Sequence, residues 1–248
     1  QLMVPALFGE WAGRVADAAG IGPGQRVLDV ACGTGVLACE VKTRVGASGK
    51  AVGLDCNEGM LTVARAKNAD IEWRHGRAEE LPFEDTSFDA VVSQFGLMFF
   101  DDRTAALREI WRVLRPGGRL AIAVWDRVEN SPGYAAMLDL HRRLLGDDAA
   151  AGLNAPYCLG DKDLLAAAFA DAGISRLAID TRDGLARYPS IETWVHTDIK
   201  GWTIADRVSD AEYRTMLDTA ERELTVFTDA SGKVRFSHGA HIVTAQKP

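Results

Sequence analysis

The chain has 248 residues, of which 47% are hydrophobic, and its formal net charge is −7. This length and apolar content support a full globular core and exclude a disordered chain. The negative charge, with arginine and lysine interspersed among acids, argues against a DNA or tRNA substrate. The longest apolar stretches, such as 120–125, are too short to cross a bilayer. No signal segment opens the sequence, although a start at Gln1 rather than Met is consistent with a missing N-terminal segment.

The cysteine pattern bears on metal binding and on the cellular compartment. Three of the four cysteines lie within or beside the segment 27–56, and no C-x-x-C pair occurs. The four are Cys32, Cys39, Cys56 and Cys158. This spacing fits neither a zinc site nor a disulfide framework. We therefore expect no metal, and a reducing, cytoplasmic location.

The first half of the chain alternates helix and strand patterns. Residues 1–19 are predicted to be helical, because Leu7, Trp11 and Val15 recur at helical spacing. Strands are predicted at 26–31, 51–56, 71–75, 88–95 and 119–125, and helices at 36–45, 58–68 and 103–114. The segment 115–118, R-P-G-G, is predicted to be a turn. Such alternation predicts an α/β fold with a doubly wound, mostly parallel sheet.

The pattern becomes irregular after residue 125. Predicted helices lie at 134–145, 162–172 and 210–224, and predicted strands at 174–180 and 234–246. We expect one domain over 1–248, with a cofactor-binding core at 20–126. Two insertions, 127–161 and 187–230, are expected to form a lid for the substrate, because loops at the strand ends build the active sites of such folds. Residues 162–186 and 231–248 are expected to complete the sheet.

The segment 27–35 is the most informative part of the sequence. It reads V-L-D-V-A-C-G-T-G and joins a predicted strand to a predicted helix. Gly33 and Gly35 allow a tight turn and the close approach of a ligand. The free amides of the following helix face that turn. Strand, glycine turn and helix together predict a site for a nucleotide-like cofactor.

The residues of this turn also distinguish between cofactors. Gly33, Gly35 and Ala38 fit G-x-G-x-x-A, and Asp55 follows at the distance of a ribose-binding acid, so a dinucleotide is an alternative. Asp29 disfavours it, because a carboxylate near a pyrophosphate is repelled. S-adenosylmethionine places a cationic ammonium group there, which gains from Asp29 directly or through water. The alternatives that involve no ligand are that Asp29 caps a neighbouring loop and that Asp55 is part of the N-terminal cap region of the helix at 58–68.

Four motifs in order resemble class I S-adenosylmethionine-dependent methyltransferases. They are 27–35, 52–60 (V-G-L-D-C-N-E-G-M), 76–93 (G-R-A-E-E-L-P-F followed by S-F-D-A-V-V-S) and 107–120 (L-R-E-I-W-R-V-L-R-P-G-G-R-L). They cover about half the chain, and the ubiquinone/menaquinone-biosynthesis-like branch (methyltransferase type 11) is the most similar. The resemblance implies a seven-stranded Rossmann-like sheet, whose last strand is antiparallel and inserted between the two preceding strands.

The resemblance also assigns roles to single residues. It implies that Asp55 holds the ribose hydroxyls, that Cys56 and Met60 lie against adenine, and that Ala78 and Glu79 bind its edge. Met60 is equally compatible with core packing. Arg77 departs from the pattern, because the branch commonly has an acid there; a solvated arginine is the alternative. The expected cofactor-binding residues are Trp11, Asp29, Gly33, Thr34, Gly35, Asp55, Cys56, Met60, Ala78, Glu79, Ser93 and Gln94.

Residues for the methyl acceptor and for acid–base chemistry are less well defined. Phe95, Met98 and Phe99 follow the fourth strand and suit an apolar pocket, although the same run fits a plain core. His196, His238 and His241 are weak catalytic candidates, because most histidines are structural or exposed.

The expected function is in-line methyl transfer from S-adenosyl-L-methionine to a small, apolar or aromatic metabolite, with S-adenosyl-L-homocysteine as product. Two other classes stay open: a methyl-donor-binding regulatory or scaffold protein without turnover, and an NAD(P)-dependent oxidoreductase. The expected partner is a small-molecule substrate, with no nucleic acid and no membrane span. The expected oligomeric state is a monomer or homodimer.

Overall fold

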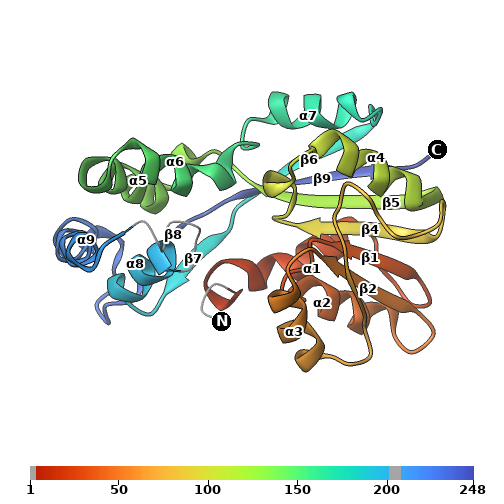
Figure 1. Cartoon of the computed structure of the whole chain (residues 1–248), viewed down its shortest axis with the longest axis horizontal. Helices are drawn as coiled ribbons and strands as arrows, with labels where there is room; N and C mark the ends of the chain where they lie inside the picture. Colours follow the sequence, from red (N-terminus) through yellow and green to blue (C-terminus); the bar gives the residue numbers. More distant parts are fainter. Residues whose placement is uncertain (1–3, 201–207) are drawn as a thin grey trace. The chain divides into compact units, whose positions relative to one another are not determined.

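The computed structural model describes residues 4–200 and 208–248. In this part of the chain, seven strands form one sheet (Figure 1). In spatial order they are β3 (Glu72–His75), β2 (Lys50–Asp55), β1 (Arg26–Val30), β4 (Phe88–Gln94), β5 (Leu114–Trp125), β9 (Ala240–Gln246) and β6 (Leu177–Arg182). The pairs formed by the first five strands in this order are all parallel. The predicted doubly wound α/β fold is therefore confirmed.

The helices divide between the two faces of this sheet. The connections of β1 to β2 and of β2 to β3 run in one direction, through α2 (Val36–Val45) and α3 (Glu58–Lys67). The connection of β4 to β5 runs in the other direction, through α4 (Arg103–Val113). Right-handed crossovers therefore put α2 and α3 on one face and α4 on the other. Helix α7 (Lys162–Asp171) packs against α4, and α1 (Gly9–Ala18) is joined to α2 by Arg44.

Strand β9 runs antiparallel to β5, as the family resemblance implies. The amide of Gly117 donates to the carbonyl of Lys247 at one end of the pair, at 2.8 Å. The amide of Asp126 donates to the carbonyl of Gly239 at the other end, at 3.1 Å. Residue numbers therefore rise along β5 as they fall along β9, and β9 lies between β5 and β6.

The chain divides into two compact units. Residues 10–124, 161–181 and 241–248 form the sheet unit. The helical unit comprises the described residues among 4–9, 125–160 and 182–240. The predicted insertions, 127–161 and 187–230, belong almost wholly to the helical unit, while the predicted division into core and lid stays a prediction.

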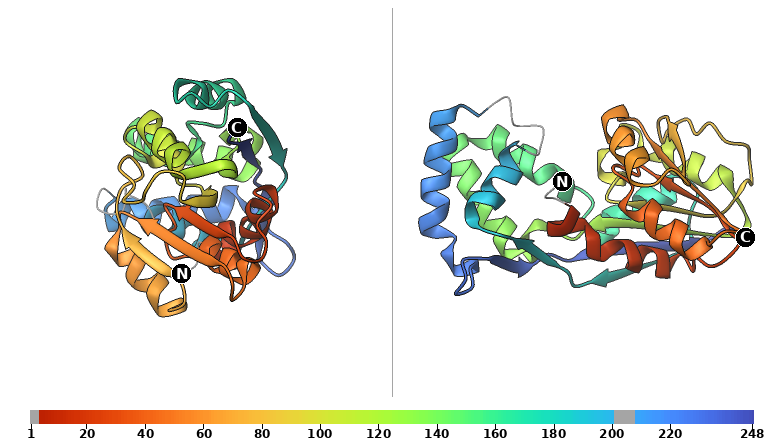
Figure 2. Two further views of the ribbon diagram at one scale, coloured as in Figure 1. Left: turned by 90° about the vertical axis from the view of Figure 1, so that its right-hand side faces the viewer. Right: turned by 90° about the horizontal axis from the view of Figure 1, so that it is seen from below.

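The helical unit contains more regular structure than the sequence predicts. Its helices are α5 (Pro132–Leu145), α6 (Asp147–Asn154), α8 (Ile191–Lys200) and α9 (Asp210–Glu223). Strands β7 (Leu185–Tyr188) and β8 (Val234–Ser237) pair side by side and antiparallel (Figure 2). Elements α6, α8 and β7 lie in segments that the sequence indicates as irregular, so that expectation is wrong there.

Several predicted elements have different bounds in the structure, among them the predicted strand 174–180, which is β6 at Leu177–Arg182. The predicted strand 234–246 is two strands, which part at His238 and Gly239, because the His238 amide donates to the carbonyl of Gly184. The segment 115–118 is part of β5 rather than a turn, and Gly117 accommodates it with φ +75°. In the predicted helix 1–19, a π-helical segment, Val4–Phe8, precedes α1. Residues 1–3 lie outside the described residues.

One row of residues across the sheet explains a glycine in β2. Asp29 pairs with Gly53, and Gly53 pairs with Trp73, so the three positions share one face. A Cβ at Gly53 would lie 2.5 Å from the Trp73 ring and 3.0 Å from the Cys32 sulfur. The indole of Trp73 therefore lies across β2 where only glycine leaves room.

We predict that Gly53→Ala lowers the free energy of unfolding by about 1–3 kcal/mol, because the added methyl overpacks the Trp73 contact. Gly22→Ala is the matched control, since a Cβ at Gly22 would meet nothing within 4 Å. Urea unfolding followed by circular dichroism measures both variants. Equal stability of the two would contradict this account of Gly53.

Candidate cofactor site

The carboxyl ends of β1 and β4 form the point where the strand order of the sheet reverses. The chain leaves β1 toward β2 on one side and leaves β4 toward β5 on the other. Ligands of open α/β sheets bind in the crevice at such a point. The residues just beyond both strands, Ala31 and Phe95, have positive φ of 57° and 59°. A left-handed backbone at non-glycine residues is a strain that concentrates at functional sites.

The loops beyond β1 and β4 are in close contact. A Cβ on Gly96 would lie 2.6 Å from the Cβ of Ala31 and 2.9 Å from the Ser93 Oγ. Gly96 therefore permits the approach of the two loops. Ser93 is fully buried, and its Oγ has no hydrogen-bond partner among the described residues.

Asp29 lies within the sheet unit rather than at its surface. Its side chain is 1% exposed, and neither carboxylate oxygen has a hydrogen-bond partner in the described part of the chain. Burial and then the charge of Asp55 raise the pKa of Asp29 well above its ordinary value, while the nearby Ala38 amide lowers it. A buried acid without a partner costs free energy, so its retention suggests a functional role. Because the Asp29 carboxyl is buried, we expect it to act on a ligand indirectly rather than by direct contact.

Asp55 joins the end of β2 to the glycine turn. Its Oδ2 accepts the Gly33 amide at 2.8 Å, and its Oδ1 accepts the Asn57 amide at 2.8 Å. Asn57, not Asp55, caps α3, because its Oδ1 accepts the Met60 amide at 3.1 Å. Asp55 is thus not the N-cap residue, but it binds the amide of that residue and so belongs to the N-terminal cap region of α3. Each oxygen of the Asp55 carboxylate keeps a further lone pair for a ligand.

The first turn of α2 offers amides without helical partners. Its N-cap is Gly35, with φ +82° and no side-chain cap, and the first intrahelical bond is from the Cys39 amide to the Gly35 carbonyl. The amides of Val36 and Leu37 can thus serve a ligand, whereas the amide of Ala38 interacts with Asp29. A Cβ at Gly35 would lie 2.5 Å from Trp73, whereas a Cβ at Gly33 would meet nothing within 4 Å. Open space at Gly33 fits the approach of a ligand there.

The residues predicted to face adenine lie at the surface of the sheet unit. Met60 is 43% exposed, which argues against a core role, and Cys56 is also exposed. The carbonyl of Cys56 contacts His75 Nε2 at 3.0 Å. The predicted contact residue Thr34 uses its carbonyl to accept from Lys67 Nζ, at 3.0 Å. An exposed thioether beside the end of β2 is available to an apolar ligand group.

The loop after β3 carries the other predicted adenine contacts. Ala78 is buried, and Glu79 Oε1 accepts the Asp101 amide at 3.0 Å. Arg77 is not merely solvated: its Nη2 donates to Asp101 at 2.5 Å, and its Nε lies 3.4 Å from Glu79 Oε2. One side of the Glu79 carboxylate therefore holds the start of α4, and its remaining lone pairs are available to a ligand.

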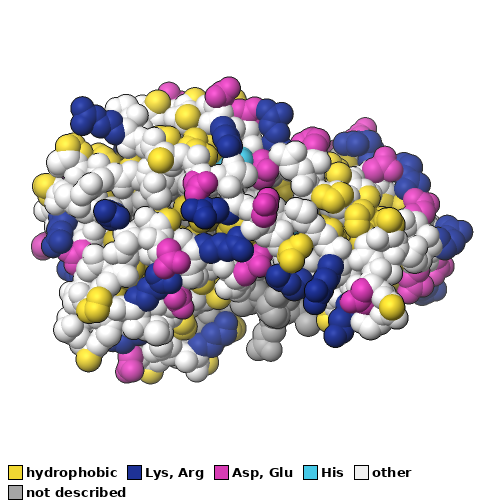
Figure 3. All heavy atoms as spheres, turned by 180° about the vertical axis from the view of Figure 1, so that it is seen from behind, with side chains coloured by type: hydrophobic (Ala, Val, Ile, Leu, Met, Phe, Trp, Pro, Cys, Tyr) yellow, Lys and Arg dark blue, Asp and Glu magenta, His cyan; other side chains and the backbone are white. Residues whose placement is uncertain are grey.

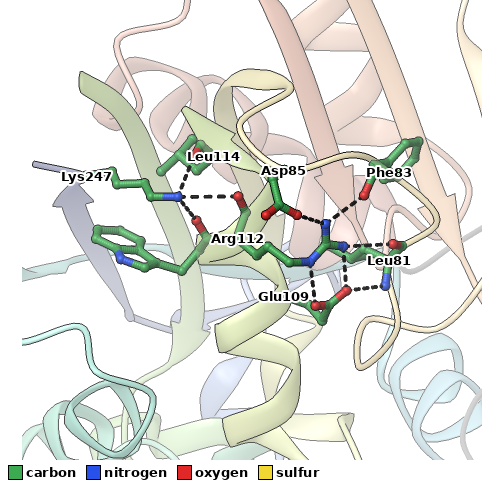
Figure 4. Close-up of polar contacts among 8 residues, drawn as sticks. Leu81, Phe83, Asp85, Glu109, Arg112, Leu114 and Lys247 are labelled. Atoms are coloured by element: carbon green, nitrogen blue, oxygen red, sulfur yellow. Dashed lines mark hydrogen bonds and ion pairs between the residues drawn. The ribbon is translucent and has the colours of Figure 1, made fainter. Parts of the chain in front are cut away.

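Arg112 fixes the same loop to α4, a contact that sequence reasoning missed (Figure 4). The guanidinium donates to the carbonyls of Leu81 and Phe83, at 3.0 and 2.8 Å, and to Asp85 at 2.7 Å. Glu109 binds it through both oxygens at 2.7 Å and accepts the Leu81 amide at 2.9 Å. The hydrogen bond from Arg112 lowers the pKa of Glu109. The planar fork of arginine suits this set of acceptors.

Lys247 fixes the other end of α4. Its Nζ donates to the carbonyls of Trp111 and Leu114, at 2.6 and 2.7 Å (Figure 4). A cation at a helix C-terminus satisfies carbonyls that have no intrahelical partner. Helix α4 is thus held by Arg112 on the loop side and by Lys247, the residue that follows β9.

The residues predicted to border the substrate have different environments. Phe95 and Met98 are buried, which matches their alternative reading as core residues, whereas Phe99 is 51% exposed. Trp11 is buried, and its ring meets Phe95 edge to face at 5.8 Å. Gln94 ends β4 and is half-buried. Trp11 is therefore packed against the strained residue after β4 rather than standing free above the crevice.

The three candidate histidines have different surroundings. His241 lies in the sheet unit, where its Nδ1 contacts Thr181 Oγ1 at 3.0 Å. His196 is exposed on α8, in the helical unit. His238, in the same unit, is 2% exposed, stacks 4.0 Å from the Trp125 ring and contacts Ser131 Oγ at 3.1 Å. Each remains a weak candidate.

The described residues contain neither a candidate metal cluster nor a candidate membrane-spanning helix. Residues 4–200 and 208–248 contain no group of three or more His, Cys, Asp or Glu that could hold a metal ion. Within the same ranges, no helix has the length and apolarity needed to span a membrane.

We predict that Arg112→Lys frees the loop after β3, because lysine cannot replace the several hydrogen bonds of the guanidinium. Amides at 77–86 should exchange with solvent about tenfold faster, as a loss of about 1.4 kcal/mol would give. Hydrogen exchange with mass spectrometry measures this. Arg108→Lys in the same helix is the control, since Arg108 makes a single contact, with the Asp171 carbonyl; identical exchange in the two variants would refute the clamp.

We also predict that the helical unit loses stability in acid. Burial lowers the pKa of His238 from its ordinary value of 6.5 to about 3, so between pH 6.5 and pH 3 only the unfolded chain takes up this proton. Stability therefore falls as the pH drops below 6.5, by up to about 5 kcal/mol near pH 3. Urea unfolding between pH 7 and pH 4, followed by tryptophan fluorescence, should show a smaller loss in His238→Gln than in the wild type. The same pH slope in both would exclude His238 as the cause.

Comparisons with known proteins agree with this geometry. Residues 2–142 match the model of the ubiE/COQ5 methyltransferase family. The ubiquinone/menaquinone biosynthesis C-methyltransferase UbiE of Idiomarina loihiensis is 42% identical over 123 residues, which cover 47% of this chain and 49% of that protein. The demethylmenaquinone methyltransferase of Staphylococcus aureus is 45% identical over 111 residues, covering 44% and 46%. This chain thus spans about half the length of these curated relatives.

A solved structure extends the likeness of the fold over the whole chain. The YcgJ protein of Bacillus subtilis superposes with a TM-score of 0.64 and 23% identity, and the match covers 96% of this chain and 98% of that one. The family match covers more than half of the chain and contains the glycine turn, Asp29 and Asp55. The chain therefore belongs to the ubiE/COQ5 methyltransferase family.

Proposed function

We propose that the chain binds S-adenosyl-L-methionine and transfers its methyl group to a small, apolar or aromatic molecule, releasing S-adenosyl-L-homocysteine. The observation that carries this proposal is the Asp29 carboxyl, buried without a hydrogen-bond partner among the described residues, just below the glycine turn. A cationic ligand above the turn offsets the cost of burying that acid. An anionic pyrophosphate at the same place would increase it, which disfavours the NAD(P) alternative.

The residues around the turn fit the other parts of the donor. The amides at the start of α2 suit its carboxylate, and the free lone pairs of Asp55 suit ribose hydroxyls. Exposed Met60 and the loop carrying Ala78 and Glu79 suit the adenine ring and its edge. Thr34, Ser93 and Gln94 would complete the border of the site.

The chain contributes positioning and exclusion of water rather than a fixed nucleophile. Bound S-adenosylmethionine supplies a methyl group already activated on a positive sulfur. The residues at the ends of β1 and β4 would hold that group in line with the acceptor, which is the main source of rate in such a transfer. Buried Phe95 and Met98 give this border an apolar character that keeps water out. A base is required only where the acceptor still carries its proton.

The relatives support an apolar acceptor, and the cysteines of this chain support a reducing location. Two of them are named for ubiquinone or menaquinone biosynthesis and for demethylmenaquinone. The four cysteines are all free, which supports a cytoplasmic location. Basic and acidic side chains are intermixed on the face in Figure 3, which supports a small molecule rather than a nucleic acid as partner.

We predict that Asp29→Asn and Asp55→Asn each weaken binding of S-adenosylmethionine at least about tenfold, the effect of losing one charge-assisted contact. Isothermal titration calorimetry measures the affinity, and thermal melting checks the fold. Asp70→Asn, at an exposed position before β3, is the matched control.

The same titrations separate the alternatives. Tight binding of NADH without a response to S-adenosylmethionine would overturn the proposal. Binding of the methyl donor, with no S-adenosylhomocysteine formed from a pool of aromatic metabolites, would favour a binding protein without turnover.

A further inference from the structure

A pocket of about 340 Å³ lies within the sheet unit, apart from the candidate cofactor site. Residues of β5, β9 and the start of β6 line it, together with Ala18 at the end of α1, and Figure 1 shows the three strands side by side. Arg119 of β5 pairs with Ala90, whereas the crevice lies beyond Gln94, four residues further along β4. Four residues of strand span about 13 Å. A pocket of this volume is large enough for a small organic molecule.

The polar residues of this pocket belong to the face of the sheet opposite α4. Side chains of a strand alternate between the two faces, and Lys247 reaches the end of α4. Thr244 and Gln246, at the alternate positions of β9, therefore belong to the other face. Ala178, which lines the pocket from β6, is exposed, so the described elements leave this part of the sheet open.

Two arginines without a counter-charge line the pocket, which we call the arginine pocket. They are Arg119 and Arg176, and both are exposed. Neither guanidinium takes part in a hydrogen bond or an ion pair with the residues that the structure describes. The described residues that line the pocket include no acid, since Asp180 of β6 lies outside it. In a chain whose net charge is −7, the arginine pocket is therefore a local positive site.

The turn after α1 holds Arg119 in place. Gly20 in this turn has φ +63°, and a Cβ there would lie 2.9 Å from Arg119 Nη1. The guanidinium thus lies directly against the backbone of the turn, where glycine leaves room for it. A cation near the end of a helix is favoured by the helix dipole, so Arg119 also stabilises α1. Arg176 lines the pocket from the segment before β6, on the other side of β9.

A phosphate group suits this pair of arginines better than a carboxylate does. A phosphate monoester has three terminal oxygens and nearly two negative charges at neutral pH, so it can accept from two guanidinium forks at once. A carboxylate has two oxygens, which a single fork occupies. Neighbouring strands lie about 4.8 Å apart, so Arg119 and Arg176, on either side of β9, start about 10 Å apart. Their long side chains can therefore reach one phosphate between them.

We propose that the arginine pocket binds a small organic phosphate monoester. Arg119 and Arg176 bind the phosphate oxygens, and the hydroxyl of Thr244, on the strand between them, is a further donor. The apolar side chains of Ala18 and Ala178 contact the organic part of the ester. This inference does not rest on the proposed function, because none of these residues belongs to the candidate cofactor site.

The test compares phenyl phosphate with benzoate, which carries a carboxylate in place of the phosphate. Isothermal titration calorimetry of the whole chain at one fixed ionic strength measures both affinities, since salt screens such contacts. We expect phenyl phosphate to bind at least about tenfold more tightly, the effect of one further charge-assisted contact. Equal affinity for the two, or no binding of phenyl phosphate at about 10 mM, overturns the inference.

Variants of Arg176 locate the binding, because this residue is exposed and its loss should leave the melting temperature unchanged. Arg176→Gln should weaken binding of phenyl phosphate about tenfold. Arg176→Lys keeps the charge but loses the fork, so its affinity should be intermediate. Arg214→Gln removes the same charge from an exposed position on α9 and is the matched control. Wild-type affinity in Arg176→Gln, or an equal loss in Arg214→Gln, refutes the arginine pocket as the site. If Arg176→Gln does not fold, the affinity of Arg176→Lys decides.

The first turn of α2 also suits an anion, so the two sites have to be separated. Saturation with S-adenosylhomocysteine should leave the affinity for phenyl phosphate unchanged. Displacement of phenyl phosphate by it, together with normal binding in Arg176→Gln, would assign the phosphate to the cofactor site and overturn the inference. A chain that binds phenyl phosphate through Arg176 but never binds S-adenosylmethionine would refute the proposed function and leave the arginine pocket as a phosphate site.

The phosphate monoester can belong to a free metabolite or to a lipid head group, and a second arm separates these sources. Vesicles of phosphatidylcholine with phosphatidic acid are sedimented with the chain and compared with vesicles of phosphatidylcholine alone. Binding to the phosphatidic acid vesicles that is lost in Arg176→Gln assigns the arginine pocket to a lipid head group. Binding of phenyl phosphate without binding to the vesicles assigns it to a free ester.

Discussion

The hydrogen bond between the Asp55 carboxylate and the Gly33 amide is the constraint on which the candidate site depends. It joins the end of β2 to the turn after β1, so the two loops that would hold a ribose and an amino acid keep a fixed spacing. Asp29, at the end of β1 just before this turn, is buried. Without this bond the turn would be free to open, and water could reach Asp29. The acid would then no longer favour a cation over an anion.

Backbone strain and unpaired polar groups occur together at this edge of the sheet. Ala31 and Phe95 carry positive φ, and Ser93 and Asp29 are buried with unpartnered oxygens among the described residues. A sequence optimised only for stability would remove these features, because each costs about 1–3 kcal/mol. The remainder of the sheet unit can offset that cost, since the interior strands are almost wholly buried and apolar. The hydrogen bonds of Arg112 to the loop after β3 likewise give rigid support, while the strained and unpaired groups cost free energy.

The sequence predicts the part of the fold that depends on local patterns. Strands β1 to β4 and helices α2 to α4 follow from apolar periodicity and from the glycine turn, and their bounds differ by one or two residues at most. The break between β8 and β9 was missed, because it depends on a backbone contact of His238 with Gly184, far away in the sequence. Arg112 was missed for the same reason: its acceptors lie about 30 residues earlier, and nothing in its own helix marks it. Asp29 and Asp55 were predictable because a motif fixes their position.

The residues of the two units are under different constraints. The family match ends at residue 142, so it covers the donor motifs but leaves out Tyr188, Trp194 and Asp198. Their contact with Tyr134, which lies 64 positions before Asp198, is one that no local pattern reveals. A donor site has to recognise one cofactor in every member of a family, whereas an acceptor site has to differ between members. Chemistry that is specific to this chain is therefore to be expected outside the matched segment.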